Sequence, residues 1–146
     1  MSSAVLAGCA LPTGFLFLVD DDTGCVIEPV LLYLMERFLI RHGNTRPNTL
    51  RATVYNLKDW WAFLAEFAKT WNEVSEDDLR FYRDAMLQTV SPKTHQPYDV
   101  GTVRRRLTTV LQFYDWARRA GFFGVTFDSK STRQIVSSMD HDALAH

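Results

Sequence analysis

The residues with the clearest chemical potential lie between Asp99 and Gly121. Two threonines and two arginines follow the three- and four-residue spacing of one helix face, at Thr102, Arg105, Arg106 and Thr109. Apolar residues follow the same spacing on another face, at Val103, Leu107, Val110, Tyr114 and Ala117. We expect the apolar face to be buried. A surface that combines guanidinium and hydroxyl groups can bind an anion, and the most obvious polymeric anion is nucleic acid.

Composition limits the class of protein. A length of 146 residues predicts one domain, and 47% hydrophobic residues are enough for a core. A formal net charge of -1 excludes a globally basic nucleic-acid binder. The charges nevertheless segregate, because residues 1–30 carry only acidic groups, whereas residues 93–119 carry six basic groups, Lys93, Arg104, Arg105, Arg106, Arg118 and Arg119, against Asp99 and Asp115. A near-neutral total can therefore hide a basic face.

The sequence predicts no metal site, no cofactor and no membrane-spanning segment. The two cysteines, Cys9 and Cys25, form no CxxC motif, which favours a reduced, cytosolic setting. Residues 6–9 resemble a lipoprotein cleavage box. A signal peptide needs a basic residue before its apolar run, however, and no lysine or arginine precedes residue 9. The acidic turn at residues 20–22 lacks the ligand spacing of an EF-hand. No apolar run approaches the length of a membrane span.

The hydrophobic periodicity predicts an all-α, four-helix bundle preceded by a short β-hairpin or extended segment. Two short extended runs flank the acidic turn, at residues 15–19 and 25–27. We expect helices over 29–42, 48–69, 76–90 and 99–121, with Ser75 as the N-cap of the third. The aromatic residues of the second helix are expected in the core: Trp60, Trp61, Phe63 and Phe67. The predicted divisions are a leader with the short extended element over residues 1–27, a helical domain over 28–123, and a tail or linker over 124–146. Residues 1–14 are expected to be a loose leader.

Three patterns occur in order along the helical region. The second helix begins Asn48-Thr49-Leu50-Arg51-Ala52 and continues with Leu57, Trp61, Phe63 and Leu64. The third begins Ser75-Glu76-Asp77-Asp78-Leu79 and continues with Tyr82. The fourth contains Gly101-Thr102-Val103-Arg104-Arg105-Arg106-Leu107, followed by Phe113 to Ala117 and Gly121. Over residues 28–123 the sequence resembles the N-terminal core-binding, SAM-like domain of tyrosine recombinases, the phage integrase family. The chain departs from the family where Thr53 replaces a frequent tyrosine.

The resemblance implies a helical domain that forms one half of a clamp around duplex DNA at a recombination half-site. Its second and fourth helices would face the major groove. Carried over position by position, the residues facing DNA would be Thr49, Arg51 and Tyr55 on the second helix, and Thr102, Arg105, Arg106 and Thr109 on the fourth. Arg104 would contact phosphate or solvent. The implied partners are double-stranded DNA, a C-terminal catalytic domain and other recombinase subunits. The implied location is the bacterial cytoplasm, in association with the nucleoid.

Several of these residues have simpler interpretations that the sequence leaves open. Thr102 competes with Asp99 for the N-cap of the fourth helix, and Thr49 competes with Asn48 for that of the second. The run from Arg104 to Arg106 can be a solvated charged face, since three consecutive residues cannot all point one way. No histidine is followed three residues later by arginine, so the family's catalytic motif is absent, and we expect no DNA cleavage by this chain alone. The alternative is a non-enzymatic protein-interaction module.

Overall fold

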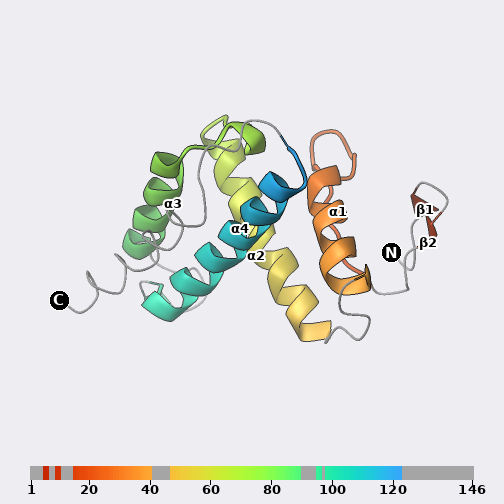
Figure 1. The fold of residues 1–146 in the computed structure, drawn as a ribbon. Helices are drawn as coiled ribbons and strands as arrows, with labels where there is room; N and C mark the ends of the chain where they lie inside the picture. The colour runs from red at the N-terminus through yellow and green to blue at the C-terminus, as the bar shows by residue number, and fades with distance from the viewer. Residues whose placement is uncertain are drawn as a thin grey trace. The chain divides into compact units, whose positions relative to one another are not determined.

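The computed structural model describes residues 5–6, 9–10, 15–40, 47–89, 95–96 and 98–122. The chain divides into two compact units, residues 1–55 and 56–146, and each is described by itself. The predicted all-α class is confirmed, since the long elements are helices: α1 (Glu28–Met35), α2 (Pro47–Glu66), α3 (Glu76–Gln88) and α4 (Val100–Arg119) (Figure 1). Within these ranges no helix combines the length and the apolar character needed to cross a bilayer.

The first unit contains short extended pieces, α1 and the N-terminal half of α2. Strands β1 (Val5–Leu6) and β2 (Cys9–Ala10) pair antiparallel in a segment that was predicted to be a loose leader, because four residues are too few to show an alternating pattern. The predicted extended runs form one antiparallel bridge, Val19 to Val26. Asp20 closes the turn between them by accepting hydrogen bonds from the backbone N–H groups of Asp22 and Thr23.

Helix α1 begins beside Pro29, as predicted, because proline lacks the N–H that a first helical turn leaves unpaired. Its apolar face is buried at Val30, Leu31 and Leu34. The helix continues as a π-helical segment, Glu36–Ile40, in which Arg37 Nη1 donates to Tyr33 Oη at 2.8 Å. The predicted end of this helix at His42 and Gly43 lies outside the described residues.

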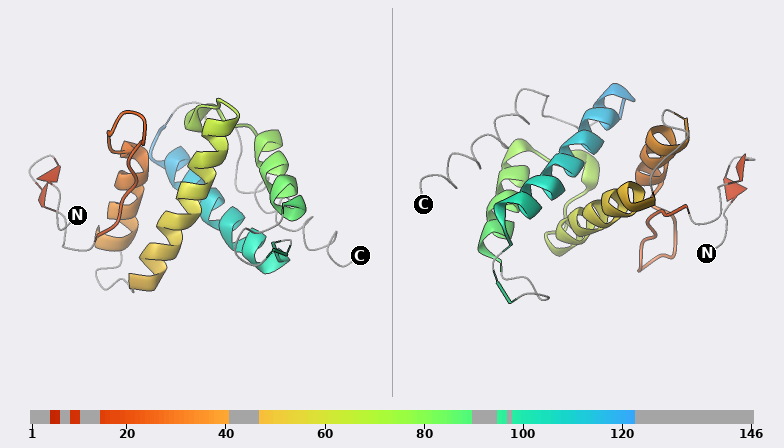
Figure 2. Two further views of the ribbon diagram at one scale, coloured as in Figure 1. Left: turned by 180° about the vertical axis from the view of Figure 1, so that it is seen from behind. Right: turned by 90° about the horizontal axis from the view of Figure 1, so that it is seen from below.

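The second unit is a core built from the C-terminal half of α2 with α3 and α4. Helix α4 crosses α2, and α3 packs against both, as the views in Figures 1 and 2 agree. The largest fully buried side chains come from all three helices and include Trp60, Tyr82, Phe113 and Tyr114. Tyr114 links α4 to α2 and to the 3-10 turn that contains Trp71. Its hydroxyl accepts a hydrogen bond from Trp60 Nε1 and donates one to the carbonyl of Trp71 at 2.6 Å.

The helix ends follow local rules. Ser75 caps α3 in a capping box with Asp78, as predicted. Helix α2 ends at Glu66, three residues before the predicted end, because the chain turns left-handed at Ala68 (φ 53°). One prediction about the core is wrong. Trp60 is fully buried, and Trp61 and Phe63 are half-buried at the edge of the core. Phe67 is 46% exposed, because it follows the last residue of α2, and it packs on the exposed Phe81.

Candidate nucleic-acid interface

The predicted face of α4 lies on one side of the helix and borders its crossing with α2. Thr102, Arg105, Arg106 and Thr109 recur at three- and four-residue intervals, whereas Arg104 is exposed on another side. Arg105 is exposed, and Arg106 and Thr109 are half-buried beside the core residues Leu107 and Val110. The helix therefore brings together four of the five predicted positions of α4.

Asp99 is the N-cap of α4, which settles the competition with Thr102. The Asp99 carboxylate accepts from the backbone N–H of Thr102 at 2.7 Å. This hydrogen bond lowers the pKa of Asp99. The start of the helix already carries its own anion, and the hydroxyl of Thr102 is left to accept from Arg105 Nη2 at 3.2 Å.

Arg105 folds back over the first turn of α4. A Cβ atom at Gly101 would stand 3.4 Å from Arg105 Nη1 and 3.1 Å from Asp99 Oδ1, so glycine makes room for this arrangement. The guanidinium group is thus placed at the end of the helix where the dipole is positive, and where a cation is disfavoured. The charge of Arg105 also lowers the pKa of Asp99, so the cap carboxylate offsets part of this unfavourable interaction with the dipole.

Thr109 is a structural link as well as a surface residue. Its hydroxyl donates to the carbonyl of Arg105 at 3.0 Å and accepts from Asn56 Nδ2 of α2 at 3.0 Å. The side chain of Asn56, which the sequence analysis did not single out, therefore lies at the edge of this face. Its signal in the sequence is weak: a polar position, followed by Asp59 three residues later, beside the apolar stripe of α2.

Arg106 is held from two sides. Its Nη1 lies 3.5 Å from Asp59 Oδ2, and its guanidinium carbon lies 4.7 Å from the centre of the Tyr98 ring. Asp59 also accepts a hydrogen bond from the hydroxyl of Tyr82 on α3. Burial, and then the Asp59 carboxylate, raise the pKa of Tyr82, which keeps it protonated as a donor. Asp59 and Tyr98 were not predicted, because their contacts depend on how the helices cross.

The predicted residues of α2 belong to the first unit. Arg51 and Tyr55 are one turn apart on a shared side of the helix, and both are exposed, Tyr55 by 56%. Thr49 is exposed on another side, and its carbonyl accepts from the hydroxyl of Thr53 at 2.9 Å. Because α2 begins at Pro47, both Asn48 and Thr49 lie inside its first turn, and neither is the N-cap.

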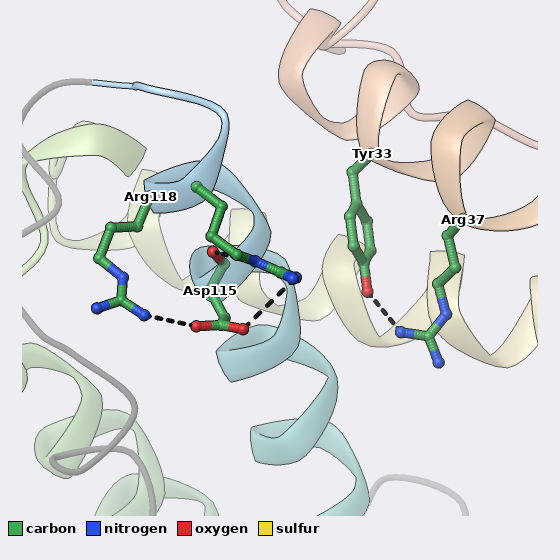
Figure 3. Close-up of polar contacts among 5 residues, drawn as sticks. Tyr33, Arg37, Asp115 and Arg118 are labelled. Carbon is green, nitrogen blue, oxygen red and sulfur yellow. Dashed lines mark hydrogen bonds and ion pairs between the residues drawn. The ribbon is translucent and has the colours of Figure 1, made fainter. Parts of the chain in front are cut away.

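A second group of arginines lies at the C-terminal end of α4. Arg118 Nη2 donates to Asp115 Oδ1 at 2.7 Å, a contact shown in Figure 3, and Arg119 Nη2 lies 3.5 Å from Asp115 Oδ2. The helix then ends in a Schellman motif. Gly121 (φ 87°) donates to the carbonyl of Arg118, and Phe122 donates to that of Ala117.

The sequence of these helices matches a known protein family over residues 34–121, described as the phage integrase N-terminal SAM-like domain. The chain belongs to this family. The match runs from α1 to the glycine that ends α4 and confirms the resemblance drawn from the residue patterns. No curated protein and no solved structure matches the chain. Within its described ranges, the integrase SAM-like domain contains no group of three histidine, cysteine or acidic side chains placed to hold a metal ion.

Proposed function

We propose that this integrase SAM-like domain binds duplex DNA at a recombination half-site and positions it for the catalytic domain of a tyrosine recombinase. The observation that carries the proposal is Arg105, an exposed cation that folds back to the N-terminal turn of α4, beside the hydroxyl of Thr102. Arginine suits this role because its planar guanidinium can hold a phosphate or a guanine edge with two hydrogen bonds.

The proposed DNA surface has two parts that we treat separately. On α4 it comprises Thr102, Arg105, Arg106 and Thr109, whereas Arg104, on another side of the helix, would contact phosphate or solvent. On the N-terminal half of α2 it comprises Thr49, Arg51 and Tyr55, which are all exposed. Phosphate contacts would supply most of the affinity, and few side chains would read base edges. Specificity from this domain alone would therefore be partial.

Salt dependence tests the proposal directly. We expect weak binding of the chain to a fluorescein-labelled duplex of mixed sequence, because the net charge is -1. We expect the affinity to fall steeply between about 50 and 200 mM salt, since bound arginines release counterions from the DNA. Fluorescence anisotropy measures both quantities. Equal affinity at the two ends of this range would contradict DNA binding through phosphates.

A second candidate function is supported by a different surface. Phe67 and Phe81, 46% and 52% exposed, pack edge to face with ring centres 5.2 Å apart, and a pair of exposed aromatic rings is typical of protein-contact surfaces. On this alternative the domain is a protein-interaction module. The variant Arg105→Glu separates the two, because Arg105 is exposed whereas Arg106 is held against Asp59. DNA binding predicts lost affinity with unchanged circular dichroism, whereas the interaction module predicts unchanged capture of a protein partner.

A further inference from the structure

The crossing of α2 and α4 places a carboxylate inside the basic face of α4. Asp59 Oδ2 lies 3.5 Å from Arg106 Nη1, and it also accepts from the hydroxyl of Tyr82. The Asp59 side chain is 39% exposed and the Arg106 side chain is 24% exposed. Both charges are therefore close to the surface that Arg105 and Thr109 share, and a ligand of that face would meet the two together.

Three contacts keep this pair in place. Tyr98 stacks against the Arg106 guanidinium at 4.7 Å on one side. Tyr82, which is 2% exposed, fixes the Asp59 carboxylate from α3. Moving Arg106 toward an external phosphate would leave Asp59 without its cation next to that phosphate, and like charges repel. The three arginines of the run are therefore not equivalent.

We propose that Asp59 is a positioning residue that neutralises Arg106 within the DNA surface and so limits the strength of DNA binding. This inference rests on the function proposed above. The cation on this face that counts toward DNA affinity is then Arg105, and Arg106 contributes its contacts to Tyr98 and α2. An internal ion pair releases no counterions from DNA, because its net charge is zero.

A double-mutant cycle on Asp59 and Arg106 tests the proposal. The intact chain is titrated into a labelled duplex, and the affinity is measured at a series of salt concentrations. Asp59→Asn removes the carboxylate but keeps an oxygen that can accept from Tyr82. We expect it to raise the affinity several-fold and to steepen the slope of log affinity against log salt by about 0.9, the value for one added phosphate contact. Arg106→Gln, which leaves Asp59 unpaired, should weaken binding. The double variant Asp59→Asn, Arg106→Gln should return to the wild-type slope.

Two matched variants control for net charge and for packing. Asp77→Asn makes the same charge change at an exposed position of α3 and should leave the slope unchanged. Tyr82→Phe keeps the Asp59 carboxylate and removes its hydrogen bond, so it should lower the melting temperature without steepening the slope. Circular dichroism confirms that each variant is folded, and Asp59→Ser replaces the asparagine variant if that one melts below the assay temperature.

The outcomes separate this proposal from the one on which it rests. If Asp59→Asn leaves the slope unchanged, or if the double variant binds as weakly as Arg106→Gln, then Arg106 contacts phosphate itself and the role given to Asp59 is wrong. DNA binding would still stand in either case if Arg105→Gln weakens it. If neither the wild type nor any variant shows salt-dependent binding, both proposals fail.

Discussion

Helix α4 carries arginines near both of its ends, and the two groups are built differently. Arg118 and Arg119 lie in the last turn, where the helix dipole favours cations, and Asp115 pairs with both. Arg105 folds back to the first turn, where the dipole opposes a cation. The C-terminal pair can be explained by helix stability alone. The N-terminal arginine is opposed by the dipole and attracted by the Asp99 cap, and its exposed guanidinium can also bind an external anion.

The sharpest way to test this contrast is to reverse one charge at each end. We expect Arg105→Glu to lower the affinity for duplex DNA about tenfold at moderate salt, since two charges change at the proposed contact. Arg118→Glu makes the same change on the same helix and should have a much smaller effect. Fluorescence anisotropy at one salt concentration measures both. Equal losses would show that only net charge matters.

Glycine substitutions compare the two ends for stability. Gly121→Ala should lower the free energy of unfolding by about 1 kcal/mol, because alanine is disfavoured in the left-handed conformation of the Schellman motif. Gly101→Ala should cost less, because a helical glycine gains about 0.5–1 kcal/mol on replacement by alanine. That gain offsets the contact of 3.1 Å with Asp99. Urea denaturation measures both values, and a larger loss at Gly101 would contradict the assignment.

Neutralising one arginine at each end of α4 should give a smaller difference in the free energy of unfolding than the glycine substitutions do. Arg118→Gln removes a dipole interaction and an exposed ion pair, so we expect a loss of about 0.5 kcal/mol in the free energy of unfolding. Arg105→Gln should cause a smaller loss, because the dipole opposes the cation that it removes and only the exposed Asp99 carboxylate attracts it. Thermal denaturation followed by circular dichroism compares the two variants. A loss for Arg105→Gln as large as that for Arg118→Gln would mean that both arginines support the helix equally.

The smallest effect should appear in the pH dependence of the stability that the Asp99 N-cap gives to α4. The backbone N–H of Thr102 lowers the pKa of Asp99 below its ordinary value of 3.8, so the carboxylate stabilises the folded state above that pH. This contribution is lost as the pH falls below 3.8 toward the lower folded-state pKa. The difference in melting temperature between the wild type and Asp99→Asn should therefore be constant near neutral pH and shrink in acid. A difference that grows in acid would have the wrong sign.

Local rules were sufficient to predict most of the fold. The spacing of apolar residues located the four helices, and the Ser75 cap and the glycine at 121 marked two of their ends correctly. The end of α2 was placed too late because Ala68 adopts a left-handed conformation that glycine usually supplies. Phe67 was predicted to be buried for the same reason, since the apolar stripe was extended past the true end of the helix.

The site was less predictable than the fold because its contacts join distant residues. The sequence placed the four residues of α4 on one face, which depends only on helix geometry. It could not show that Arg106 meets Asp59, 47 positions earlier, or that Asn56 meets Thr109, since both contacts depend on the register at which α4 crosses α2. The DNA contacts themselves stay predictions for the experiments described above.

The distribution of tryptophan has a practical consequence for following the unfolding of this protein. All four tryptophans, at positions 60, 61, 71 and 116, lie in the unit formed by residues 56–146. Their intrinsic fluorescence therefore reports on that unit alone, whereas far-ultraviolet dichroism also detects α1. If the two signals give coincident transitions, the chain unfolds as a single cooperative system; if they separate, the units melt independently.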